Sequence, residues 1–253
     1  MWSLEAIADL AVNALAARDD ELRNEQAVRG LDALDELTLH PLIAGAFQRA
    51  GFGVLREQPY PHEWTRKVRP LSPDAAGVLP IRRDRQRCDI VLTPEPAQVL
   101  HDALQSERAR REERLEISGT LFESAIPAPV PLPRPDAVSP EDAFWIEVKV
   151  VGQYTLAGHV LGVNRSYSSD LIRAGLSDLS KLAADERIRA GCLLLVLFTA
   201  DQATAVHDLA VMARRCLDKA LPIESPAVRH FRIPDRLGNT NCSVSVLGFR
   251  RHG

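Results

Sequence analysis

The chain has 253 residues, of which 45% are hydrophobic and 26% charged, and its formal net charge is −3. These values are typical of a globular protein that buries a core, and they exclude a uniformly basic nucleic-acid-binding protein. The four cysteines include no Cys-x-x-Cys pair, which predicts neither a zinc site nor a disulfide framework and favours a reducing, cytoplasmic setting. No apolar run reaches the length of a membrane span, so we expect no membrane partner.

The first part of the chain is predicted to be helical. Apolar residues at helical spacing predict an amphipathic helix in an N-terminal extension, residues 1–24, and not a signal peptide. A second helical stretch is predicted around Leu31 to Leu37 and a third from Leu39 to Gly51. Pro41 is expected in the first turn of the third helix or at a kink, because it donates no backbone hydrogen bond. His40 is accordingly interpreted as a helix-start residue and not as a ligand.

Strands follow, with a long segment between two of them. A strand is predicted from Gly53 to Gln58, and residues 62–85 are predicted to form a loop or an irregular hairpin. Two further strands, Gln86 to Thr93 and Phe144 to Val151, flank residues 94–142. This segment is charged and then proline-rich, so it predicts an insertion between two core strands, with a helix from Gln98 to Ile117.

The rest of the chain alternates helices and strands, which predicts an α/β fold. The run from Cys192 to Phe198 is continuously apolar, as in a strand buried on both faces. The predicted elements are a helix from Ser169 to Asp185, a strand from Cys192 to Phe198, a helix from Thr204 to Ala220, and strands from Val228 to Ile233 and from Ser243 to Phe249.

Charged residues interrupt two of the apolar strands. Glu147 and Lys149 are two residues apart and therefore share one face of a strand, while Ile146 and Val148 point to the other. Asp89 has the matching place on the preceding strand. Burying unpaired charge is costly, and a bound cation would offset that cost. If the two strands are neighbours, the three polar groups converge on one point.

This pattern resembles the PD-(D/E)XK, or restriction-endonuclease-like, nuclease superfamily. The family's motif is an acid on one strand, then Glu or Asp, any residue and Lys on the next; here these are Asp89, Glu147 and Lys149. The family often adds a Glu in its first core helix, before an apolar stretch that ends in Gly and an aromatic residue. Glu36 matches that Glu, and Gly51-Phe52 matches the end of that stretch. The resemblance implies that residues 25–253 contain a central mixed β-sheet flanked by helices, with a core order of helix, three strands, helix and strand.

The resemblance also implies a chemistry. Mg²⁺ or Mn²⁺ would be held by the carboxylates of Asp89 and Glu147 and the carbonyl of Val148. Lys149 would orient the attacking water, and help deprotonate it or balance transition-state charge, and Glu36 would support a second metal or position a metal-bound water. The implied reaction is phosphodiester hydrolysis in defence or DNA processing. DNA is favoured over RNA as the partner, and a homodimer is compatible with the family.

Other interpretations stay open. Four polar residues beyond the motif strand are candidate substrate contacts: Gln153, Tyr154, Arg165 and Ser168. Asp89 alone is typical of a strand-end turn, and Glu147 with Lys149 is typical of a surface charge pair. Two alternatives to a nuclease therefore remain. The chain would be either a non-catalytic nucleic-acid-binding or assembly module on the same fold, or an unrelated α/β protein with a structural charge pair.

Overall fold

The computed structural model describes residues 2–62, 86–101, 136–157 and 160–251. A mixed six-stranded sheet is the centre of the α/β fold, and every neighbouring pair in it is antiparallel except β5 and β8, which are parallel. From edge to edge the strands are β1 (Gly53–Pro59), β2 (Arg87–Thr93), β5 (Phe144–Gly152), β8 (Ala190–Thr199), β10 (Asn241–Arg250) and β9 (Ala227–Arg232).

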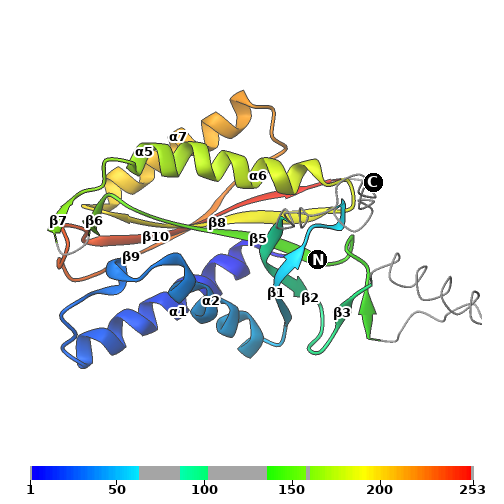
Figure 1. Ribbon diagram of the computed structural model, residues 1–253, viewed down its shortest axis with the longest axis horizontal. Helices are drawn as coiled ribbons and strands as arrows, with labels where there is room; N and C mark the ends of the chain where they lie inside the picture. Colours follow the sequence, from blue (N-terminus) through cyan, green and yellow to red (C-terminus); the bar gives the residue numbers. More distant parts are fainter. Residues whose placement is uncertain (1, 63–85, 102–135, 158–159, 252–253) are drawn as a thin grey trace, which may run out of the picture.

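Helices cover both faces of this sheet (Figure 1). One face carries α1 (Leu4–Asn24) and α2 (Glu36–Arg49). The other carries α5 (Tyr167–Ser169), the π-helical turn η2 (Asp170–Ala174), α6 (Gly175–Ala184) and α7 (Gln202–Asp218). Two hydrophobic cores lie between these layers, and all ten residues of β8 are buried because the strand faces both cores. The prediction of a doubly buried strand is confirmed.

The N-terminal helix is part of the first core. The Ser3 side chain accepts a hydrogen bond from the backbone N–H of Ala6 and so caps α1. The buried face of the helix, which includes Ile7, Ala11 and Leu15, packs toward α2, β9 and β10. No helix in the described part of the chain has both the length and the apolar character that a membrane crossing requires.

Helix α2 begins earlier than predicted. The Asp35 carboxylate accepts a hydrogen bond from the Thr38 N–H at 2.9 Å, which satisfies a free donor of the first turn and starts the helix at Glu36. The separate helix predicted around Leu31 to Leu37 is wrong, since only the 3-10 turn η1 (Leu31–Ala33) precedes α2. Pro41 therefore lies in the second turn, where it removes one hydrogen bond to a solvent-exposed residue, Leu37.

Two short strand pairs were not predicted. A hairpin of β6 (Tyr154–Ala157) and β7 (Val160–Val163) follows β5 directly. In the insertion, β3 (Val99–Leu100) pairs in parallel with β4 (Ala137–Val138), so the predicted helix is wrong at its start. The remainder of that helix, in residues 102–135, and residues 63–85 of the predicted loop lie outside the described residues.

Close approach of β8 to β5 requires a glycine. A Cβ atom on Gly191 would lie 2.6 Å from the Trp145 carbonyl oxygen and 3.1 Å from the Phe249 ring. We therefore expect Gly191→Ala to lower the free energy of unfolding by about 1–3 kcal/mol, measured by urea denaturation. Gly162→Ala is the matched control on the exposed β7, because no atom lies within 4 Å of its Cβ position. Equal unfolding midpoints for the two variants would contradict the close packing.

Candidate active site

Strands β2 and β5 separate at the position of Asp89. Their pairing runs from Leu92 opposite Phe144 to Ile90 opposite Ile146. Beyond that point the Val148 N–H donates to the Asp89 carboxylate at 2.8 Å, so a side chain takes the place of a backbone acceptor. The N–H and C=O of one strand residue point to the same side, so the Val148 carbonyl faces the same gap.

The alternation of β2 breaks at Asp89, which the sequence did not indicate. A regular strand would place Cys88, Ile90 and Leu92 on one face, but Cys88 packs in the second core whereas Ile90 and Leu92 pack in the first. On the neighbouring strand the residue opposite Asp89 is Glu57, whose φ of 52° is left-handed and which the β1–β2 register omits. This local distortion turns the Asp89 side chain into the gap beside β5.

Glu147 is buried next to Asp89. Its exposed fraction is 6%, and it accepts a hydrogen bond from the hydroxyl of the buried Tyr60. Burial raises the pKa of Glu147 to about 9, helped by the charge of Asp89 and a side-chain hydrogen bond with it, while the Tyr60 hydrogen bond works in the opposite direction. The cluster by itself therefore holds a proton on Glu147 at neutral pH, and a cation would displace that proton.

Lys149 is held by Glu36. The Lys149 Nζ lies 3.2 Å from Glu36 Oε2, and the same oxygen accepts a hydrogen bond of 3.2 Å from the Val150 N–H. Burial tends to lower the pKa of Lys149, but the charges of Glu36, Asp178 and Asp89 outweigh it and the pKa is raised. Lys149 is therefore a cation at neutral pH, and Glu36 fixes the first turn of α2 to β5.

Two residues of this cluster, Tyr60 and Asp178, were not predicted from the sequence, and Lys181 pairs with the second of them. Lys181 Nζ lies 2.7 Å from Asp178 Oδ1, and its pKa is raised because Asp178, Glu147 and Asp89 outweigh the effect of burial. Asp178 occupies an apolar-face position of α6, three residues after the buried Gly175 and four before the buried Leu182. An acid at that position is a signal that the sequence did contain.

The four candidate substrate contacts lie beyond the end of β5 or in α5. Gln153 accepts a hydrogen bond from the Ala200 N–H at 3.0 Å, and the backbone of Tyr154 exchanges hydrogen bonds with the Asn239 side chain. Arg165 and Ser168 are exposed. None of the four has a described contact with Asp89, Glu147 or Lys149, so the structure brings together the motif residues and Glu36 but not these four.

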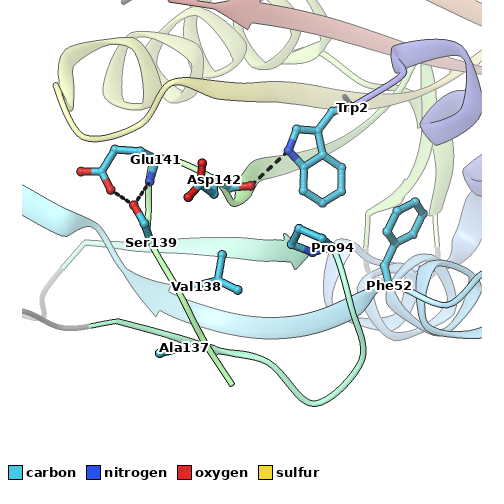
Figure 2. Close-up of a pocket in the computed structure, with 8 residues that line it drawn as sticks. All are labelled: Trp2, Phe52, Pro94, Ala137, Val138, Ser139, Glu141 and Asp142. Carbon is cyan, nitrogen blue, oxygen red and sulfur yellow. Dashed lines mark hydrogen bonds between the residues drawn. The ribbon is translucent and has the colours of Figure 1, made fainter. Parts of the chain in front are cut away.

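A surface pocket lies near the start of β5, whereas the four candidate substrate contacts lie beyond its end (Figure 2). It is lined by β4 and the residues between β4 and β5, by Pro94 just after β2, and by the aromatic side chains of Trp2 and Phe52. Trp2 Nε1 donates to the Asp142 carbonyl at 3.3 Å, and Figure 2 shows this contact across the pocket. The motif residues do not line it, so the pocket is separate from the charged cluster.

The raised pKa of Glu147 makes the stability of the metal-free protein depend on pH. Between the ordinary value of 4.5 and about 9, the folded protein binds a proton that the unfolded chain has lost. The stability from this group is fully present below pH 4.5 and is lost as pH rises toward 9. We expect the free energy of unfolding in EDTA to fall by up to about 1.4 kcal/mol per pH unit in this window.

Glu147→Gln should remove this fall, because the amide does not titrate. The control Glu21→Gln, on exposed α1 surface, should keep the wild-type slope in the same urea titrations. A wild-type slope in Glu147→Gln would show that other groups cause the pH dependence.

Comparisons with protein-family models, with curated proteins and with solved structures find no match for this chain. A function has to be argued from the chemistry of the cluster.

Proposed function

We propose that this protein is a metal-dependent nuclease that hydrolyses phosphodiester bonds, with DNA as the favoured substrate. The observation that supports it most is the meeting of the Asp89 and Glu147 carboxylates in the gap between β2 and β5, with Lys149 on the same strand face as Glu147. A structural ion pair would match each acid with a base. Glu36 forms an ion pair with Lys149, and Asp178 forms one with Lys181, whereas the carboxylates of Asp89 and Glu147 interact with each other.

The order of the elements also supports the proposal. The resemblance implied a helix, three strands, a helix and a strand, and α2, β1, β2, β5, α6 and β8 follow in that order. The acidic positions lie on the corresponding elements, with Glu36 on the helix, Asp89 on the second strand and Glu147 on the third. The fold alone does not carry the function; the charged cluster does.

The donor set fits a hard divalent cation. Asp89, Glu147 and the Val148 carbonyl offer oxygen atoms, which Mg²⁺ and Mn²⁺ prefer, and burial together with the charge of Asp89 raises the pKa of Glu147, an effect that a cation would offset. When bound, the metal would supply Lewis-acid polarisation of the phosphate and lower the pKa of water.

The protein's own residues then have distinct tasks. Lys149 carries a positive charge that balances the charge developing on the phosphate, and its raised pKa disfavours a role as a base. Glu36 is a positioning residue, because its contacts are with the Lys149 ammonium and the Val150 N–H. Tyr60 orients the Glu147 carboxylate by donating its hydroxyl hydrogen bond.

Cleavage assays test the proposal. Purified protein is incubated with supercoiled and linear duplex DNA, single-stranded DNA and RNA in the presence of Mg²⁺ or Mn²⁺. We expect Asp89→Asn, Glu147→Gln and Lys149→Ala each to lower kcat by at least about 100-fold while circular dichroism shows the fold retained. Lys219→Ala is the matched lysine control at the exposed end of α7 and should cleave at the wild-type rate.

Two outcomes would overturn the proposal. Wild-type cleavage by Glu147→Gln would remove Glu147 from the chemistry. Retention of DNA in gel-shift assays, with no cleavage of any substrate in either metal, would favour the non-catalytic binding module.

A further inference from the structure

Asp89 also belongs to a second group of potential ligand atoms. His40, Glu57 and Asp89 each offer one atom, and these three atoms all lie within 4.8 Å of one another. They come from three elements: His40 from α2, Glu57 from β1 and Asp89 from β2. Glu147 and Lys149 do not belong to this group.

His40 is the unusual member of the group. Its exposed fraction is 2%, and neither of its ring nitrogens has a hydrogen-bond partner among the described residues. A buried polar group without a partner is costly, and such groups are rare in folded proteins. A neutral imidazole nitrogen facing two carboxylates is a common arrangement for binding a metal ion. His40 therefore points to a ligand independently of the acids.

The topology explains how the three side chains meet. His40 lies one helical turn after Glu36, so both project from the face of α2 that is turned toward the gap beside β5. Glu57 lies opposite Asp89 between two regular pairs of the β1–β2 ladder, Arg56 with Ile90 and Gln58 with Cys88. The same break in the ladder that turns Asp89 toward β5 thus brings the Glu57 carboxylate beside it.

We propose that His40, Glu57 and Asp89 form a transition-metal site that shares Asp89 with the candidate active site. The inference deepens the proposed nuclease function, because the shared carboxylate would place two cations side by side. One imidazole nitrogen and two carboxylates suit Mn²⁺, Fe²⁺, Co²⁺ or Zn²⁺ better than Mg²⁺, which prefers oxygen ligands alone. The site is partly open, since Glu57 is exposed and Asp89 is half-buried, so a metal can enter from solvent.

Binding of Mn²⁺ to the chelator-stripped full chain tests the site without any activity assay. We expect calorimetry to show two Mn²⁺ ions per wild-type chain. Pulsed electron paramagnetic resonance should show coupling to a directly bound imidazole nitrogen. His40→Gln should lose this coupling and bind Mn²⁺ at this site at least about tenfold more weakly. His207→Gln is the matched control, because His207 is exposed on α7, and it should keep the coupling.

Two further variants guard against misfolding of His40→Gln. His40→Leu places an apolar side chain in the buried position, so its metal-free thermal midpoint should match or exceed that of the wild type. Its Mn²⁺-induced rise in that midpoint should shrink. Glu57→Gln changes an exposed side chain, and it should weaken Mn²⁺ binding at least about tenfold while the nitrogen coupling persists at saturating Mn²⁺.

The outcomes separate this inference from the proposed function. Absence of imidazole coupling in Mn²⁺-loaded wild type, or its persistence in His40→Leu, overturns the site even if the protein cleaves DNA. Coupling that requires His40 supports the site even if no nucleic acid is cleaved. Glu147→Gln should lose cleavage but keep the coupling, since Glu147 is outside the three-residue group.

Discussion

Strand β5 has backbone donors that its neighbour β2 does not satisfy, and the rest of the site depends on this. After Ile90 opposite Ile146 the two strands no longer pair, yet Val148 and Val150 still need acceptors. Asp89 serves the first and Glu36 the second. The two carboxylates therefore have a structural role, as hydrogen-bond acceptors for the backbone of β5. Because they replace a backbone ladder, they come to lie beside the charged face of β5.

The charges of the cluster are not balanced by the contacts that the fold provides. The lysines of β5 and α6 pair with Glu36 and Asp178 at 3.2 and 2.7 Å. Asp89 and Glu147 lie beside each other, and burial together with the charge of Asp89 raises the pKa of Glu147 to about 9. Each unit of this rise represents about 1.4 kcal/mol by which burial and the charge of Asp89 disfavour the ionised carboxylate. The proposed cation would stabilise that ionised form.

Periodicity predicted much of the fold and the part of the site that depends on it. The apolar run of β8 and the shared face of Glu147 and Lys149 follow from burial and from the two-residue repeat of a strand. The orientation of Asp89 does not, because it results from a break in the β1–β2 ladder that no local pattern encodes. Tyr60, between two prolines, gave no sign of burial either. Pro41 misled the prediction because the Asp35 cap, four residues before the expected helix start at Leu39, determines where α2 begins.

Asp89 links the two proposed cation sites through its charge. One of its oxygens is committed to the Val148 N–H, and its negative charge is among the causes of the raised pKa of Glu147. A cation beside His40 would neutralise Asp89 and so remove that repulsion. The pKa of Glu147 would then fall, and its ionised form would become the better ligand for a second cation. This fall in pKa favours a second cation, whereas the charge of the first cation repels it, so the two sites are coupled through Asp89 with no movement of the strands.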